Sequence, residues 1–202
     1  MKHRFYIRFV LIMVAAFCCN NINAQDHSSR QSFIQEIKSP AIKDKKDRQE
    51  ILNYQARFAR QLIEEKNYNV SLDEEVIKVT IPADLLFEPN ATTLSRNANR
   101  ILEYYANRMR VPGMFTMVLA MYHDNTGSPG YCKNMTDERI RSIFDWFAIN
   151  GGVKNISYYS FGDKDPMLDN NSIDNRRLNR RLEIYLIPGP TMIENAKRHL
   201  LR

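Results

Sequence analysis

The sequence predicts an α+β domain in which helices cover one face of a mixed β-sheet. Residues 76–81 (VIKVTI) alternate apolar and polar side chains, which is typical of a half-buried strand. Residues 114–121 (MFTMVLAM) form an almost continuous apolar run, which is typical of a central strand covered on both faces. Helical periodicity lies between these two runs and again after the second one, so strands and helices are expected to alternate.

The first helix of this domain is expected after a loop bracketed by Pro82 and Pro89. Its apolar residues recur at helical spacing and would form one buried stripe: Leu94, Ala98, Ile101, Leu102, Tyr105 and Met109. Pro112 and Gly113 are expected to end it, because neither residue favours a continuing helix.

The second helix is expected to begin after the loop HDNTGSPG, with Thr136 as its N-cap. Asp137 and Glu138 would then lie in the first turn, where the helix dipole favours acidic side chains. Its buried stripe would be Ile140, Ile143, Phe144 and Phe147, and Asn150-Gly151-Gly152 would end it. Two more strands are expected at 153–161 and 181–187, which gives the order βαβαββ.

Further helical segments are expected on both sides of this domain. Ile51, Tyr54, Phe58 and Leu62 recur at three- and four-residue steps and predict an amphipathic helix. Residues 25–43 are polar and are interpreted as a linker, while 191–202 are expected to form a short basic helix. The predicted organisation is a signal peptide at 1–24, a linker and helix at 25–70, the α+β domain at 71–188 and a helical tail at 189–202.

The N-terminus has the order of regions found in a secretory signal. Lys2, Arg4 and Arg8 supply positive charge, an apolar run follows at 9–17, and Ala24 provides the small residue before a cleavage site. The apolar run is much shorter than the roughly 20 residues that a membrane-spanning helix needs. We therefore expect export, with cleavage before Gln25.

Of the three cysteines, two would leave with the signal, so Cys132 would have no partner for an internal disulfide. Cys18 or Cys19 would be a lipid attachment site if either became the first residue after cleavage. Neither follows the small residue that lipoprotein signals favour, so lipidation is only the alternative to cleavage before Gln25.

The charge balance gives no support to nucleic-acid binding. The chain has 29 Lys and Arg against 23 Asp and Glu, a net charge of +6, and three of the basic residues lie in the signal. The remaining excess of +3 is too small to indicate a nucleic-acid partner.

Asp124 and Arg139 stand out as a candidate binding pair. Asp124 lies in the loop after the second strand, and Arg139 is expected in the first turn of the helix that follows. Such a strand–loop–helix unit can place both side chains beside one pocket. A carboxylate next to a guanidinium suits a zwitterion, because the first binds an ammonium group and the second binds a carboxylate bidentately.

Residues 76–187 resemble the OmpA-like peptidoglycan-binding domain family in several separated motifs. In order they are Leu86-Phe87-Glu88 with Leu94, Asp124-Asn125-Thr126-Gly127 (family TDxxG), Met135-Thr136-Asp137-Glu138-Arg139 (LSxxR), Phe161-Gly162-Asp163 with Pro166 (GxGExxP) and Asn179-Arg180-Arg181-Leu182-Glu183-Ile184 (NRRVEI). Each motif is weak alone, but their order and spacing make the resemblance specific. It implies a two-layer βαβαββ sandwich in the periplasm, associated with the outer membrane or the cell wall.

The resemblance also implies a ligand, the diaminopimelate of peptidoglycan stem peptides, held by Asp124 and Arg139. Residues expected in the pocket wall are His123, Asn125, Thr126, Gly127, Cys132, Met135 and Thr136, and those expected at its periphery are Asn179, Arg180 and Arg181. Cys132 replaces a family Asn, and Met121-Tyr122-His123 replaces the family's GHT, so ligand choice is open to change.

No catalytic site, metal site or cofactor is expected. His123 and Asp124 are neighbours, and neighbours on a strand point to opposite faces, so they are not expected to form a dyad. The predicted function is noncovalent tethering of an envelope assembly to the wall, with an outer-membrane or surface-assembly protein binding the extra helices. The alternative is an OmpA-like interaction module of a surface or secretion complex that has lost peptidoglycan binding.

Overall fold

The computed structural model describes residues 28–66 and 69–201 and divides the chain into two units after Glu36. The predicted signal peptide and the two candidate lipidation sites lie outside the described residues. In the first unit, residues 28–36 are helical, so the prediction of a linker there is wrong. The second unit, Ile37–Arg202, contains the sheet and the candidate site.

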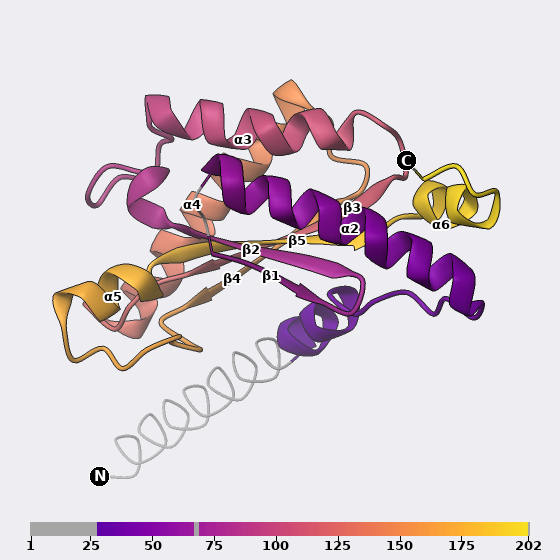
Figure 1. Ribbon diagram of the computed structural model, residues 1–202. Helices are drawn as coiled ribbons and strands as arrows, with labels where there is room; N and C mark the ends of the chain where they lie inside the picture. The colour runs from indigo at the N-terminus through magenta and orange to yellow at the C-terminus, as the bar shows by residue number, and fades with distance from the viewer. Residues whose placement is uncertain (1–27, 67–68, 202) are drawn as a thin grey trace, which may run out of the picture. The chain divides into compact units, whose positions relative to one another are not determined.

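Five strands form one mixed sheet in the order β1-β2-β5-β3-β4 (Figure 1). They are β1 (Asn69–Asp73), β2 (Val76–Pro82), β3 (Phe115–Tyr122), β4 (Ile156–Gly162) and β5 (Arg181–Pro188). Only β3 and β4 are parallel, and all other neighbouring strands are antiparallel. The predicted α+β class with a mixed sheet is confirmed.

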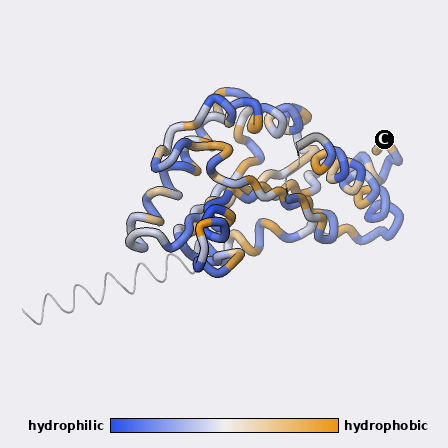
Figure 2. The backbone as a smooth tube through the Cα atoms, turned by 60° about the vertical axis from the view of Figure 1, so that its left-hand side comes forward, coloured by the Kyte–Doolittle hydropathy of each residue, from blue (hydrophilic) through white to orange (hydrophobic). Residues whose placement is uncertain are grey.

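β5 is the central strand and fixes the buried face of the sheet. Ile184 lies opposite Val79 of β2 on one side and opposite Leu119 of β3 on the other. Because side chains alternate along a strand, this register places the apolar residues of three strands on the same face. Figure 2 shows hydrophobic residues gathered along these central strands.

Four helices contribute to one buried cluster with that face: α2 (Lys45–Lys66), α3 (Arg96–Met109), α4 (Pro129–Asn150) and α6 (Pro190–Lys197). Figure 1 shows α2 and α3 on the same side of the sheet. Leu102 and Tyr105 of α3 and Phe147 of α4 are fully buried, so the predicted helical stripes face the core. The exception is Phe144, which is half-buried and packs on Tyr158 of β4. Among the described residues, no helix is both long and apolar enough to cross a membrane.

The extra N-terminal helix α2 is part of the core. Ile51 and Leu62 are both 0% exposed. The buried Gln55 amide donates hydrogen bonds to the carbonyl of Glu75 at 2.9 Å and to that of Leu186 at 3.3 Å. These contacts join α2 to the turn between β1 and β2 and to the central strand.

Two short elements were not predicted. β1 has five residues and pairs with β2 at the edge of the sheet. The seven-residue helix α5 (Ile173–Asn179) lies between β4 and β5, and the Ser172 hydroxyl caps it by accepting a hydrogen bond from the Asn175 N–H at 3.0 Å. The observed order therefore adds one strand and one helix to the predicted βαβαββ.

The predicted start of the second helix is wrong. α4 begins at Pro129, and its N-cap is Ser128, whose hydroxyl accepts a hydrogen bond from the Tyr131 N–H at 3.2 Å. The ring of Pro129 is preorganised for the first helical position. Thr136 lies inside the helix, where its hydroxyl donates to the carbonyl of Lys133 at 2.9 Å and accepts from the Gly162 N–H at 3.1 Å. Thr136 thus joins α4 to the end of β4.

Two adjacent residues of α2 test whether this helix belongs to the core. We predict that Leu62→Ala lowers the free energy of unfolding by about 2–5 kcal/mol, because it leaves a cavity. Ile63 is 48% exposed, so Ile63→Ala is expected to change it by about 0.5 kcal/mol or less. Urea unfolding followed by circular dichroism measures both, and equal effects would show that α2 is not part of the cooperative core.

Candidate ligand-binding site

A pocket of about 300 Å³ opens at the ends of β2 and β3 beside α4. Its wall contains three carboxylates and two guanidinium groups beside apolar and aromatic side chains. The lining residues are Ala83, Asp84, Phe87, Glu88, Pro89, Asn90, His123, Asp124, Thr126, Tyr131, Met135, Arg139 and Arg180. Both members of the predicted pair, Asp124 and Arg139, are among them.

Asp124 follows the last residue of β3 by two positions and is 0% exposed. One carboxylate oxygen accepts a hydrogen bond from the Thr126 N–H at 2.8 Å, which forms a tight turn. The same oxygen lies 3.3 Å from His123 Nδ1. The other oxygen pairs with the Arg180 guanidinium. The carboxylate therefore has a fixed orientation at the floor of the pocket.

Arg139 lies about three turns into α4, not in its first turn. The prediction that it lies in the first turn is therefore wrong. Arg139 is 5% exposed, its Nε donates to the carbonyl of Ala91 at 2.9 Å, and its guanidinium lies 4.9 Å from the centre of the Phe87 ring. Its two terminal nitrogens have no hydrogen-bond partner among residues 28–66 and 69–201, which leaves their donors available to a ligand.

Arg180 lies in the pocket wall, not at its periphery. It was expected at the periphery, but it lines the pocket and forms an ion pair with Asp124. Its own carbonyl accepts a hydrogen bond from the Ala83 N–H at 2.8 Å, which fixes the backbone just before β5. The Arg180 side chain is 33% exposed, whereas that of Asp124 is 0% exposed, so Arg180 is the partner that solvent reaches.

Burial and hydrogen bonding have opposite effects on the pKa of Asp124. Burial raises the pKa of its carboxyl group, but hydrogen bonds from Thr126 and the guanidinium of Arg180 outweigh this effect. The pKa of Asp124 therefore lies below its ordinary value, and the group is ionised at neutral pH. Burial lowers the pKa of Arg139 from its ordinary, very high value, which still leaves the guanidinium charged.

The other predicted wall residues divide into two groups. His123, Thr126 and Met135 line the pocket, whereas Asn125, Gly127, Cys132 and Thr136 do not. Cys132 lies behind the Asp124 loop, with its Sγ 3.4 Å from the carbonyl of Asp124 and 3.5 Å from that of Thr126. Burial raises the pKa of this thiol, so it acts as a neutral support for the loop.

Gly127 supports the loop by its backbone conformation. Its φ is +106°, which L-residues with side chains rarely adopt, and a Cβ there would lie 2.8 Å from the Tyr131 ring. The loop can therefore lie flat against Tyr131 only with glycine at this position.

The prediction that His123 and Asp124 point to opposite faces is wrong. β3 ends at Tyr122, so the alternation of a strand does not extend to them, and both line the pocket. His123 Nδ1 also lies 2.9 Å from the backbone carbonyl of Asp124. Among the described residues, no group of three or more His, Cys, Asp or Glu side chains could hold a metal ion.

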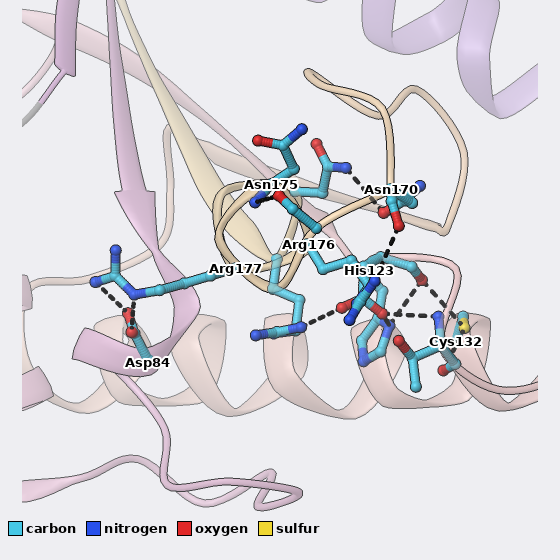
Figure 3. A network of polar contacts seen from close by, with 12 residues as sticks. Asp84, His123, Cys132, Asn170, Asn175, Arg176 and Arg177 are labelled. Atoms are coloured by element: carbon cyan, nitrogen blue, oxygen red, sulfur yellow. Dashed lines mark hydrogen bonds and ion pairs between the residues drawn. The ribbon is translucent and has the colours of Figure 1, made fainter.

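The segment around α5 forms a polar network beside the pocket (Figure 3). Arg177 pairs with the pocket residue Asp84 at 2.5 Å, and Arg176 donates to the carbonyl of Asn170 at 3.0 Å. Asn179 is buried and donates to the carbonyl of Leu168 at 2.7 Å, so it holds the preceding loop in place. Arg181 does not line the pocket and pairs with Glu183 at 2.8 Å.

The chain is 25% identical over 111 residues to a protein named outer membrane protein A from Bordetella avium, and the match covers 54% of this chain and 57% of that protein. The chain thus spans little more than half the length of this relative. No family model matches the chain.

Several solved structures have a similar fold. A MotB-like protein from Desulfovibrio vulgaris superimposes with a TM-score of 0.61 and 21% identity, over 70% of this chain and 95% of that one. Over this part of the chain, the two proteins share one fold. The cell wall anchor of the T6SS from Pseudomonas aeruginosa gives a TM-score of 0.57 and 22% identity, over 66% and 96% of the two chains. The periplasmic domain of Helicobacter pylori MotB gives 0.53 and 20%, over 67% and 88%.

The OmpA-like resemblance seen in the sequence motifs is therefore confirmed. The relatives named above include an outer-membrane protein, a periplasmic domain and a cell wall anchor. The helices α2 and α6 lie outside the strand–helix pattern expected from the motifs, although they share its core.

The ion pair at the pocket floor predicts a measurable pKa change. In Arg180→Gln, the pKa of Asp124 is expected to rise relative to the unmodified chain, because a lowering interaction is removed. Since a lowered folded-state pKa stabilises the fold above the unfolded pKa and loses this effect as pH falls, the variant should show a smaller stability difference between neutral and acidic pH. Carboxyl-carbon NMR titration measures the pKa.

Arg177→Gln is the matched control, because it removes an ion pair from the neighbouring Asp84 instead. It is expected to leave the Asp124 titration unchanged. An Asp124 pKa that is the same in both variants would contradict the role assigned to Arg180.

Proposed function

We propose that this OmpA-like domain binds the diaminopimelate of peptidoglycan stem peptides and catalyses no reaction on it. One observation supports this most directly. Asp124 and Arg139, both at most 5% exposed, lie in the wall of one 300 Å³ pocket. A buried charge is costly unless it is paired, so two charged groups of opposite sign in one pocket favour a ligand with both charges.

The arrangement suits the free end of diaminopimelate, which has an ammonium group and a carboxylate on one carbon. The Asp124 carboxylate would accept hydrogen bonds from the ammonium group. The terminal nitrogens of Arg139 would bind the carboxylate in the bidentate manner that guanidinium groups favour. Phe87 stacks on Arg139 and limits its movement, so less side-chain entropy is lost when the ligand binds.

Arg180 gives the pocket a second cation. With Asp124 it forms a pair in the free protein, and an incoming ammonium group must join or displace that pair. Since Arg180 is the partly exposed partner, it is the group expected to move, and it then lies beside the ligand's carboxylate. This arrangement favours ligands with a carboxylate over amines that lack one.

At the level of the cell, this binding would tether an envelope assembly to the wall. The expected location is the periplasm, with the chain exported by its N-terminal signal. α2 and α6 offer a surface beyond the pocket, and an outer-membrane or surface-assembly protein is the partner proposed for it. Glu50 of α2 already binds the segment after α6, through His199 Nδ1 at 2.9 Å and the Leu201 N–H at 3.2 Å.

A second candidate is an interaction module of a surface or secretion complex that no longer binds the wall. The Arg180–Asp124 ion pair favours it, because a carboxylate that is already paired attracts an ammonium group less strongly. Cys132 also provides a weaker hydrogen-bonding group than the family Asn that it replaces. The two candidates differ in whether the unmodified chain binds a diaminopimelate peptide at all.

Binding to purified sacculi tests the pair directly. Asp124→Asn and Arg139→Lys keep the side-chain size but remove the charge or the planar fork, and each is expected to reduce the bound fraction about tenfold or more. Arg141→Lys and Asp145→Asn, at exposed positions of the same helix, are the matched controls. Full binding by both pocket variants, with unchanged melting curves, would contradict the assignment.

Ligand discrimination tests the carboxylate side of the pocket. A tripeptide that ends in diaminopimelate is expected to bind at least about tenfold more tightly than the same peptide ending in lysine, which lacks the second carboxylate. Isothermal titration calorimetry measures both constants. No binding of either peptide would favour the interaction module. Equal affinities would contradict recognition of the second carboxylate by the pocket.

A further inference from the structure

A second polar groove lies between α3 and α4, apart from the pocket described above. It has a volume of about 240 Å³ and is lined by Asn99, Glu103, Ala106, Arg110, Trp146 and Asn150. No lining residue is shared with the pocket that contains Asp124 and Arg139. The groove is therefore a separate candidate site.

Trp146 is the single tryptophan of the chain and is half-buried in this groove. Its indole nitrogen donates a hydrogen bond to the Asn99 side chain at 2.7 Å, and its ring packs edge-to-face on Phe147, with centroids 5.4 Å apart and planes at 87°. These contacts fix the ring while part of it stays exposed. A fixed, partly exposed indole offers an apolar surface at low entropic cost.

The other groove residues supply both donors and acceptors with no net charge. Glu103 and Arg110 are exposed, and in the part of the chain that the structure describes neither side chain has a hydrogen bond or an ion pair. The Asn150 amide donates to the carbonyl of Trp146 at 2.8 Å, which leaves its side-chain oxygen as an acceptor. A neutral, strongly polar groove with one aromatic surface fits an uncharged ligand rich in hydroxyl and amide groups, such as a sugar.

One stripe of α4 extends from Arg139 in the first pocket to Trp146 in the groove. Arg139, Ser142 and Trp146 lie at three- and four-residue steps, and each donates a hydrogen bond to the segment 91–99. Residues at these steps lie on one helix face. Arg139 and Trp146 are seven residues apart, which at the helical rise is about 10 Å along the axis. Three residues of extended peptide also span about 10 Å.

We propose that the groove binds an N-acetylated amino sugar of the glycan strand while the stem peptide attached to that strand occupies the first pocket. The ring of Trp146 would lie against the apolar face of the sugar, and Glu103, Arg110 and Asn150 would bind its hydroxyl and acetamido groups. This inference rests on the proposed function, because it assigns the first pocket to the stem peptide. The protein would then bind both the stem peptide and the glycan strand of the wall polymer.

The experiment compares two ligands on the full chain: a diaminopimelate tripeptide, and the same tripeptide attached to its N-acetylglucosaminyl–N-acetylmuramyl disaccharide. The disaccharide form is expected to bind about tenfold more tightly by calorimetry. It is also expected to change the fluorescence of Trp146, whereas the bare tripeptide should not. Glu103→Ala should reduce only the affinity for the disaccharide form, and Asp145→Ala, an exposed acid outside the groove, is the matched control.

The outcomes separate this inference from the proposed function. If both ligands bind with equal affinity and Trp146 fluorescence does not change, the groove assignment is overturned while stem-peptide binding stands. If the tripeptide fails to bind but the disaccharide form changes the fluorescence, the groove stands and the first pocket's assignment fails. Failure of both ligands overturns both.

Discussion

The ionised carboxylate of Asp124 is the constraint around which the site is built. A carboxylate removed from water is unfavourable unless hydrogen bonds and an opposite charge compensate it. Here the compensation comes from the turn at Thr126 and from Arg180, so two segments far apart in the sequence must meet at one point. The end of β3 and the start of β5 meet there because these strands are neighbours in the sheet.

The same sheet order explains why the pocket has its present composition. Tyr122, the last residue of β3, lies opposite Arg181, the first residue of β5. The residues just beyond this pair, on both strands, therefore reach the same edge of the sheet. α4 then adds Arg139 from the side, held by the carbonyl of Ala91. The rigid strands and helix fix the charged groups, while the loops between them leave space for a ligand.

Long periodic segments were predictable from the sequence, and short or contact-dependent features were not. The buried stripes of α3 and α4 and the central strands follow from spacing alone, because many residues agree with one period. The five residues of β1 and the seven of α5 are too few to show a period. The first turns of α4 contain Pro129 and Gly130, which favour a turn when they are considered without their surroundings.

The candidate pair Asp124 and Arg139 was named from residue type and spacing, but Arg180 was placed at the periphery. Its contact with Asp124 joins residues 56 positions apart, and no local pattern indicates such a contact. The strand order would have revealed it, since it places the residue before β5 beside the residues after β3. The position of Arg180 could therefore not be predicted without the strand pairing.

The packing of α2 affects how this domain would respond to mechanical force. Ile51 and Leu62 bury α2 against the same cluster that covers the sheet, and β1 follows this helix after a short connection. A pull applied to the chain ahead of Lys45 would have to strip α2 from the core before it loaded any strand. The pocket lies at the C-terminal ends of β2 and β3. If the domain were anchored through this pocket, α2 would therefore detach first, and the ligand would stay bound while the chain extended.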